Sequence, residues 1–505
     1  MSNEFRSKAI SHMSFNGLRL LITAGSTVCT SAIMARTLGP GNMGVYSYVI
    51  WLVGTLGIVA NVGLPAALTK YVSEYIGRGD GATAAQIGRR LLQVQLGVAG
   101  TVAVLTACSA LFKSPYRSML ALAAAMIFLQ AVQQGFLAAL AGIQRFDRIT
   151  LISLYVALAQ VISVSFAAVM HASVLSMLWA TLAGSTVGIL LSYRAVNTFL
   201  LSLSKQSVRS PVPVADLYSR IWKFSSAISY VLLLDAIVWQ RSEVLFLKWY
   251  STLAQIAFYT LAYNVASKLS EISSTFSSAL LPLYSESYGR SGIGELGPVY
   301  AKALKYVQMV MVFPCVLGAA VCKPLIPLIY GASYTPVVIP LQLLLITLAF
   351  TSIGTVGSPL LVGTEKQSFV AKYGTLVAII NIALDIVLIP KYGAVGAAVA
   401  NCSAQAIGVL GGTTYVIRYT RVKFPWKSTA VIYLGAAVGI APVVYCFLGR
   451  VEIFALAGAV VMGCLLYLGV LVVAGELGMK DLSDVRTSLL RKARSSTLVE
   501  AGGPA

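Results

Sequence analysis

The sequence predicts an all-α polytopic membrane protein with about 14 transmembrane helices. Roughly fourteen apolar stretches of ~20–25 residues follow one another, and each is long enough to cross a hydrocarbon layer of ~30 Å as a helix. Their apolar residues are continuous rather than alternating, which favours helices over barrel strands. The composition agrees, with 58% hydrophobic and only 11% charged residues and a mean hydropathy of +0.82.

Hydropathy places the predicted spans in chain order, with short polar turns between them. They are 13–37, 43–68, 88–112, 117–142, 149–171, 174–200, 219–243, 251–283, 303–330, 337–363, 368–390, 393–418, 429–449 and 452–475. No turn is long enough to hold a separate soluble domain.

The basic residues gather on one side of the predicted membrane. When the loops are assigned to alternate sides, one side holds most of the 37 Lys and Arg residues. The positive-inside rule then puts both termini in the cytoplasm. A net charge of +20 would otherwise suggest nucleic acid, but topology explains the excess, so we expect no nucleic-acid partner.

Nothing in the sequence indicates an enzyme, a cofactor or a metal site. The seven cysteines are scattered without a CxxC pair, and the two histidines, His12 and His171, are isolated. No G-x-x-x-x-G-K-[ST] loop is present, so the chain does not hydrolyse ATP by that motif. A membrane glycan polymerase or ligase is the alternative from another class, and the short predicted external loops argue against it.

Short segments of the first half recur in the second half in the same order. The three pairs are 44–48 with 257–261, 73–78 with 285–290, and 140–145 with 361–366. Equivalent segments six spans apart keep their orientation, which predicts two parallel repeats. We therefore divide the chain into an N-lobe (1–205), a cytoplasmic linker (206–218), a C-lobe (219–420), two C-terminal helices (421–476) and a cytoplasmic tail (477–505).

Several motifs, in order and spacing, resemble polysaccharide flippases of the Wzx type. They are Leu38-Gly-Pro-Gly, Gly44-Val-Tyr46, Ala257-Phe-Tyr-Thr-Leu-Ala-Tyr263, Leu281-Pro282, Tyr330-Gly-Ala-Ser-Tyr334 and Ile389-Pro-Lys-Tyr-Gly-Ala-Val-Gly-Ala-Ala-Val-Ala-Asn401. The resemblance covers about residues 10–475. It implies a member of the multidrug/oligosaccharidyl-lipid/polysaccharide (MOP) exporter superfamily, with two six-helix lobes in a V-shaped, MATE-like architecture plus two C-terminal helices.

The resemblance also implies a function. Wzx-type members move undecaprenyl-pyrophosphate-linked glycan units across the bacterial inner membrane by alternating access, for O-antigen, capsule or exopolysaccharide synthesis. The expected partners are that lipid-linked oligosaccharide and membrane lipids, with polysaccharide polymerase and chain-length proteins as further candidates. A MATE-like exporter of soluble substrates or drugs and a lipid II flippase remain alternatives within the same fold.

A polar headgroup needs cations and amides inside the membrane, because unsatisfied polar groups in hydrocarbon cost several kcal/mol each. Arg19, with Asn16 before it, is the first candidate for the pyrophosphate, and a snorkelling arginine is the alternative. Arg19 also resembles part of the arginine pattern of the lipid II flippase, although the second span here lacks an arginine and Lys268 lies in the eighth. Lys268, Asn264 and Arg241 complete the predicted headgroup set.

Three acids are predicted to tune or couple transport. Glu271 lies three residues after Lys268, a spacing that suits an ion pair on one helix face. Asp235, inside the seventh span, is expected either to pair with Lys268 or Arg241 or to be protonated. Asp385 in the eleventh span is the other intramembrane acid. Structural pairing is an equal alternative for Asp235 and Asp385.

Overall fold

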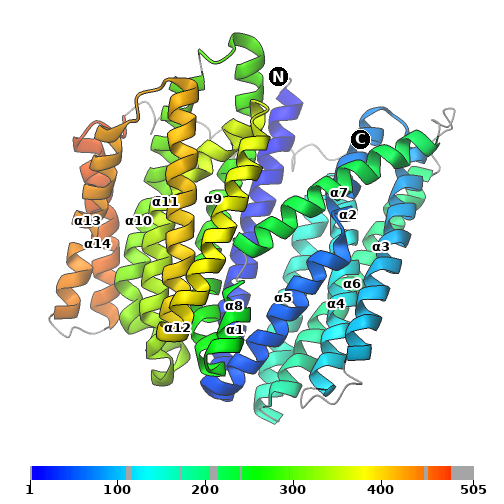
Figure 1. Cartoon of the computed structure of the whole chain (residues 1–505), viewed down its shortest axis with the longest axis horizontal. Helices are drawn as coiled ribbons and strands as arrows, with labels where there is room; N and C mark the ends of the chain where they lie inside the picture. Colours follow the sequence, from blue (N-terminus) through cyan, green and yellow to red (C-terminus); the bar gives the residue numbers. More distant parts are fainter. Residues whose placement is uncertain are drawn as a thin grey trace, which may run out of the picture. The chain divides into compact units, whose positions relative to one another are not determined.

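The computed structural model describes residues 3–109, 117–170, 173–204, 214–238, 242–294, 296–448 and 453–478, which form helices and connecting turns without a strand. In chain order the elements are α1 (Asn3–Asn61), α2 (Leu64–Gly77), α3 (Gly81–Ser109), α4 (Arg117–Gly142), α5 (Phe146–Met170), α6 (Val174–Ser204), α7 (Val214–Val238), α8 (Glu243–Tyr250), α9 (Leu253–Ser291), α10 (Leu296–Tyr330), the 3-10 helix η1 (Ala332–Val337), α11 (Val338–Gly363), α12 (Gln367–Thr420), α13 (Trp426–Leu448) and α14 (Ile453–Val473) (Figure 1).

Ten helices in the described residues are long and apolar enough to cross a membrane. Two of them, α1 and α12, each contain two predicted spans, and α7 and α9 cover the predicted seventh and eighth spans without counting among the ten. The predicted all-α, multi-pass membrane fold is therefore confirmed.

One glycine bends each of the two longest helices. Gly39 has φ 69° and Gly393 has φ 54°, a region that side-chain-bearing residues rarely adopt. Pro40 follows the first glycine and disfavours a helical conformation just before it. Each glycine lies between two spans that the sequence separates, so the chain reverses there within a few residues.

Two predicted span boundaries are wrong. The second span, 43–68, breaks at Val62–Gly63, and α2 continues from Leu64 to Gly77. Gly63 adopts φ 65°. A Cβ at this position would lie 2.5 Å from the Ser225 carbonyl oxygen of α7, so the glycine also lets α7 pack closely against the break. Hydropathy could not detect it, because both sides of the break are equally apolar.

The seventh predicted span, 219–243, includes a residue of another helix. The described part of helix α7 ends at Val238, and Glu243 is the first residue of the short helix α8. Helix α8 buries Glu243, Val244 and Leu247. The sequence placed most of these residues in a turn, because an eight-residue apolar stretch is too short to register as a span.

The chain packs as two compact units. The first comprises the described residues of Met1–Glu271, Lys323–Leu344 and Ser368–Gly408, and the second those of Ile272–Cys322, Leu345–Gln367 and Val409–Ala505.

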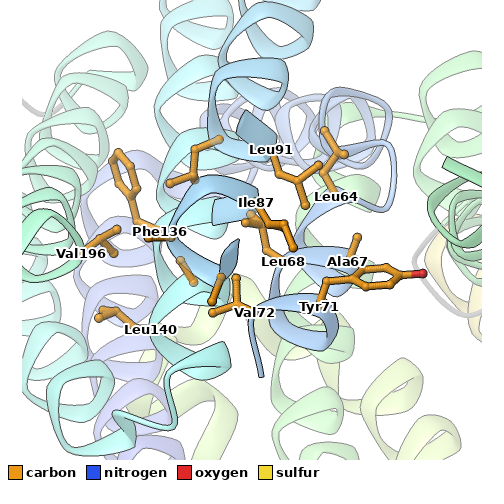
Figure 2. Close-up of a cluster of buried hydrophobic side chains, with 14 of the residues drawn as sticks. Leu64, Ala67, Leu68, Tyr71, Val72, Ile87, Leu91, Phe136, Leu140 and Val196 are labelled. Atoms are coloured by element: carbon orange, nitrogen blue, oxygen red, sulfur yellow. The ribbon is translucent and has the colours of Figure 1, made fainter. Parts of the chain in front are cut away.

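One hydrophobic core of the first unit lies among α2, α3, α4 and α6. Buried side chains of α2 pack against α3, α4 and the end of α6 (Figure 2). Gly142 of α4 lets the helices approach closely, since a Cβ there would lie 3.1 Å from Val72 Cβ. Membrane helices associate through such small-residue contacts rather than through hydrophobic burial. The core residues labelled in Figure 2 are Leu64, Ala67, Leu68, Tyr71, Val72, Ile87, Leu91, Phe136, Leu140 and Val196.

Equivalent segments of the proposed repeat share local structure. Gln144 and Glu365 both have φ 62°, and each lies just after the end of a helix. The backbone N–H of the following residue, Arg145 or Lys366, donates to a carbonyl oxygen near the end of that helix. The glycine before each turn also has an equivalent contact. Gly142 packs on α2, which carries Ser73, and Gly363 packs on Ser285 of α9, the residue that corresponds to Ser73 in the repeat. Ser73 Oγ donates to the Gly142 carbonyl oxygen at 2.7 Å. The matched turns agree with a duplication, and the lobe boundaries stay a prediction.

The second unit joins α13 and α14 to α10. Tyr467 stacks on Phe313 with ring centroids 4.6 Å apart, and its hydroxyl donates to the Met309 carbonyl oxygen at 2.8 Å. Gly439 and Gly463 bring α13 and α14 together with no room for a Cβ. The two C-terminal helices thus dock by aromatic stacking and small-residue packing.

Candidate functional site

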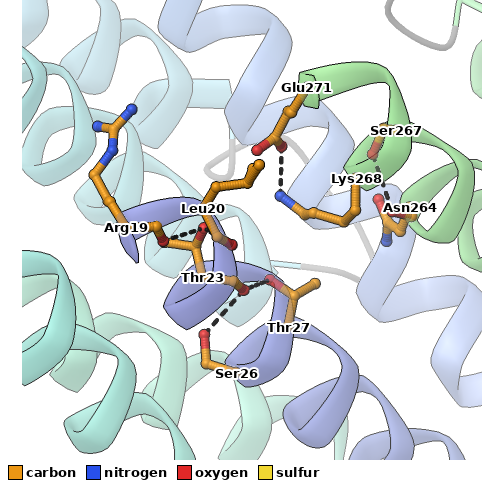
Figure 3. A network of polar contacts seen from close by, with 9 residues as sticks. All are labelled: Arg19, Leu20, Thr23, Ser26, Thr27, Asn264, Ser267, Lys268 and Glu271. Atoms are coloured by element: carbon orange, nitrogen blue, oxygen red, sulfur yellow. Dashed lines mark hydrogen bonds and ion pairs between the residues drawn. The ribbon is translucent and has the colours of Figure 1, made fainter. Parts of the chain in front are cut away.

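Helix α9 carries a partly open polar face. Lys268 Nζ lies 2.6 Å from Glu271 Oε1, the ion pair that their spacing predicts. The side chains are 25% and 42% exposed, so the pair is reachable rather than sealed in a core. Asn264, one turn before Lys268, lies on the same helix face (Figure 3).

Helix α1 presents a stripe of hydroxyls. Thr23 Oγ1 donates to the Arg19 carbonyl oxygen at 3.0 Å, Thr27 Oγ1 to that of Thr23 at 2.7 Å, and Thr30 Oγ1 to that of Ser26 at 2.8 Å. These bonds use the hydroxyl protons within the helix and leave oxygen lone pairs free to accept, on side chains that are partly exposed at Thr23 and Thr27 and buried at Thr30. The stripe is polar without a net charge.

Arg19 is exposed, and no carboxylate of the described residues forms an ion pair with it. Figure 3 shows Lys268 and Glu271 extending from α9 toward α1, whereas the Arg19 guanidinium extends away on the other side of Leu20. In this view the charged ends of the two predicted phosphate ligands point in different directions, and their joint role in binding a phosphate stays a prediction.

Three predicted residues fall outside what the structure describes. Arg241 lies outside the described residues, and the side chains of Asn16 and Asp235 do as well, although their backbones belong to α1 and α7. The predicted contacts of Asp235 with Lys268 or Arg241 thus stay a prediction.

A second polar site lies buried among α8, α9 and α12. Asn401 Nδ2 donates to Glu243 Oε1 at 2.8 Å, and Asn381 Nδ2 approaches the same oxygen at 3.4 Å. Gln405 Nε2 donates to Asn401 Oδ1 at 2.6 Å. Asp385, one turn after Asn381, interacts electrostatically with Glu243. Glu243, Asn381, Asp385 and Asn401 are fully buried, and we call these four residues the acid–amide cluster.

Several oxygens of the acid–amide cluster have no hydrogen-bond donor. They are both carboxyl oxygens of Asp385, Glu243 Oε2 and Asn381 Oδ1. Buried polar atoms without partners cost roughly 1–3 kcal/mol each, and more when they are charged. No basic residue forms an ion pair with either acid in the described part of the chain. This arrangement of oxygens suits a proton or a small hard cation.

Of the four residues of this cluster, the sequence predicts only Asp385 as a site residue. Glu243 falls at the end of the seventh predicted span and is not among the predicted site residues. The available signal was the spacing of Asn381 and Asp385 on one helix face, with Asn401 and Gln405 beyond the Gly393 bend. That signal could not identify Glu243, because its contact with Asn401 spans 158 residues.

A third group of contacts joins α1 to the end of α10 and to η1. The Arg36 guanidinium donates to the carbonyl oxygens of Leu328 and Ile329, near the C-terminus of α10, and its Nε lies 2.8 Å from the Ile329 oxygen. Tyr334 Oη donates to the Ala35 carbonyl oxygen at 3.1 Å. Helix C-termini present unsatisfied carbonyls and partial negative charge, so an arginine is a favourable cap. These contacts lie beside the Gly39 bend of α1, which the charge pattern assigns to the outer side.

Comparison with known proteins identifies the family. Residues 11–288, more than half of the chain, match the family described as polysaccharide biosynthesis protein. The chain belongs to this family. The predicted resemblance to polysaccharide flippases of the MOP superfamily is therefore confirmed.

Individual relatives agree with the family match. The chain is 22% identical over 409 residues to the probable low-salt glycan biosynthesis flippase Agl15 of Haloferax volcanii, covering 80% of this chain and 83% of the relative. Its fold is similar to the lipid II flippase MurJ in an inward closed conformation, at 16% identity and a TM-score of 0.64 over 91% of this chain and 98% of that one. An inward-facing MATE multidrug transporter of the MOP superfamily gives 0.60 at 15% identity, over 78% and 96%.

These relatives are flippases and transporters rather than enzymes, which agrees with the predicted transporter class. The structural similarities lie below 25% identity, so they establish the fold and do not identify the substrate.

Proposed function

We propose that this family member is a flippase that translocates a polyprenyl-pyrophosphate-linked oligosaccharide from the inner to the outer leaflet by alternating access. In a bacterial cell the carrier is undecaprenyl pyrophosphate, the membrane is the inner membrane, and the product serves surface polysaccharide synthesis. The termini lie in the cytoplasm, as the positive-inside rule requires.

The observation that carries the proposal is the partly exposed Lys268–Glu271 ion pair on the polar face of α9. A lysine inside a membrane helix is costly and marks a substrate or ion path by default. Glu271 holds the lysine charge while no ligand is bound, and the two oxygens of a phosphate can replace the carboxylate. The α1 hydroxyls supply acceptors for sugar hydroxyls, so the two helices match the two halves of a lipid-linked sugar headgroup.

The acid–amide cluster is our proposal for the coupling site. It lies on both sides of the Gly393 bend in α12, and broken helices commonly frame ion sites in transporters. Asp385 and Glu243 bring two carboxyl groups together without a cationic side chain, so a proton or a monovalent cation would bind there. A bound ion would lock α8 and both halves of α12 to one another.

The test of the headgroup site is K268A in cells that depend on this protein for their surface glycan. Losing a charge-assisted hydrogen bond to the substrate costs about 1.5–3 kcal/mol, which corresponds to about a ten-fold or greater fall in glycan output. K268R preserves the charge and is expected to retain most of the output. K391A, which removes an exposed lysine of α12, is the matched control.

All variants are compared at equal membrane abundance. Full glycan output from K268A would contradict the headgroup role of Lys268. Loss of drug resistance without any change in glycan would favour the soluble-substrate exporter instead.

A further inference from the structure

A cavity of about 430 Å³ lies at the start of α3, and its described lining residues come from α3 and α7. Arg89 and Arg90 are the charged residues that line it in the described part of the chain. Gln86 and Gln93 add two side-chain amides, and Tyr218 contributes from α7. All four α3 side chains are exposed, so the guanidinium and amide donors are available at the surface.

The four polar residues share one face of α3. Positions 86, 89, 90 and 93 follow the three- and four-residue spacing of a helix stripe. The opposite face is packed into the first unit through Ile87, Leu91 and Gln95. The cavity therefore lies on the outer surface of this helix and is not a gap in the core.

No carboxylate of the described residues neutralises the two arginines. The acids closest in the chain are already engaged. Glu74 accepts hydrogen bonds from Arg78 and Arg220, and Asp80 Oδ1 accepts from the Thr83 backbone N–H at 3.0 Å. The pair thus presents a concentrated positive charge to an external ligand.

The same face of α3 becomes apolar beyond Gln93. Leu96 is 40% exposed and Val104 is 60% exposed, and both continue the spacing of the arginine stripe. Exposed apolar side chains on a membrane helix face acyl chains. The charge pattern places Arg89 and Arg90 at the inner end of α3, which is the level of the headgroups. This face therefore has the polarity of a lipid molecule, charged at one end and apolar along its length.

We propose that this face of α3 binds the phosphate of a membrane lipid, with Arg89 and Arg90 on the phosphate oxygens and Leu96 and Val104 along the chain. Arginine forks match phosphate oxygens in a bidentate manner, and basic pockets at the cytoplasmic side of membrane helices bind anionic headgroups. The phosphate belongs to an anionic phospholipid or to a polyprenyl pyrophosphate awaiting transport, and the probes of the test distinguish these two sources. The proposal goes beyond the transport function and does not depend on Lys268.

The test uses the purified full-length protein and three probes: dioctanoyl phosphatidylglycerol, farnesyl pyrophosphate and farnesol. Binding is measured by native mass spectrometry and by fluorescence competition. We expect the wild-type chain to retain at least one phosphate-bearing probe in preference to farnesol. R89Q/R90Q should weaken that binding about ten-fold or more, since each charged hydrogen bond contributes about 1.5–3 kcal/mol.

Two further variants separate charge from geometry. R194Q/K372Q removes the same charge from exposed positions that do not line the cavity and should bind like wild type. R89K/R90K keeps the charge but loses the fork, and we expect intermediate binding. All variants must match wild type in elution volume and Tm.

Preference for phosphatidylglycerol or for farnesyl pyrophosphate identifies the source of the phosphate, and either result supports the site. Equal binding of farnesol, or undiminished binding by R89Q/R90Q, would overturn it. Because no transport is measured, such a failure would leave the K268A test of the proposed function unaffected.

Discussion

Asp385 shows how strongly the role of one residue depends on its neighbours. An isolated intramembrane acid would be expected to find a basic partner, but here its neighbour is the acid Glu243, and amides of Asn381 and Asn401 face that acid. Lys268 has the opposite setting, since its own helix supplies Glu271. The Asp385–Glu243 pair of acids needs a proton or a bound cation to neutralise it. In the Lys268–Glu271 pair, by contrast, an anionic ligand can replace the carboxylate and bind the lysine.

At this scale we predict that an ion stabilises the wild-type protein through Asp385. Raising sodium at constant ionic strength, or lowering pH if the ion is a proton, should raise the Tm. At ten times its Kd such an ion contributes about 1.4 kcal/mol. D385N removes one carboxylate and should abolish the response and lower glycan output about ten-fold. The measurement is a thermal melt of purified protein in sodium, potassium and pH series.

D147N is the matched control, because Asp147 pairs with Arg145 outside the acid–amide cluster. It should keep the wild-type ion response. An unchanged response in D385N would contradict the acid–amide cluster as the ion site.

At the scale of elements, the motifs shared with polysaccharide flippases coincide with helix breaks and close helix contacts. Gly39 and Gly393 bend α1 and α12, while Gly44 lies directly against the backbone of Leu253 at the start of α9. Arg36 caps the end of α10 close to the same bend. The glycine-rich motif after the first span therefore packs α1 against α8, the start of α9 and η1.

The corresponding prediction compares two glycines of that motif. A methyl group at Gly44 would clash with Leu253 backbone atoms, which cannot move without shifting α9, whereas nothing lies within 4 Å of a Cβ at Gly41. Over-packing of this kind costs about 1–3 kcal/mol. G44A should therefore have a lower Tm and lower glycan output than G41A, as measured by thermal melts and surface glycan. Equal behaviour of the two variants would refute the close contact.

At the scale of the whole molecule, charge asymmetry sets the orientation, and the helices set the number of crossings. The turn between α10 and α11 should lie outside, and the turn between α11 and α12 should lie inside with Lys366 and Lys372. Thr335 in η1 and Ser368 at the start of α12 are exposed polar residues next to these two turns, and each can be replaced without removing a charge.

We predict opposite accessibility for cysteines at these two positions in a variant lacking the seven native cysteines. A membrane-impermeant maleimide should label T335C in intact cells, and S368C only after permeabilisation. Labelling is read by mass shift on a gel, with the cysteine-free chain as the blank. The reverse pattern would place the termini outside and contradict the orientation.

The sequence by itself determined the helical membrane fold, the family and the Lys268–Glu271 pair. Each of these follows from local information: twenty apolar residues in a row, motifs in order, or a three-residue spacing on one helix. The sequence did not predict the break at Gly63, because hydropathy is continuous across it. It also did not predict helix α8, because that helix is too short to form a span.

Only the tertiary structure decided which distant residues meet. It placed Glu243 beside Asn401 and Asp385, turned Arg19 away from Lys268, and set Arg36 on the end of α10. These outcomes depend on how helices rotate and pack against one another, and packing among uniformly apolar surfaces is fixed by small-residue contacts such as Gly44 on Leu253. Hydropathy reports that a helix is in the membrane but carries little information about which face it turns to its neighbours.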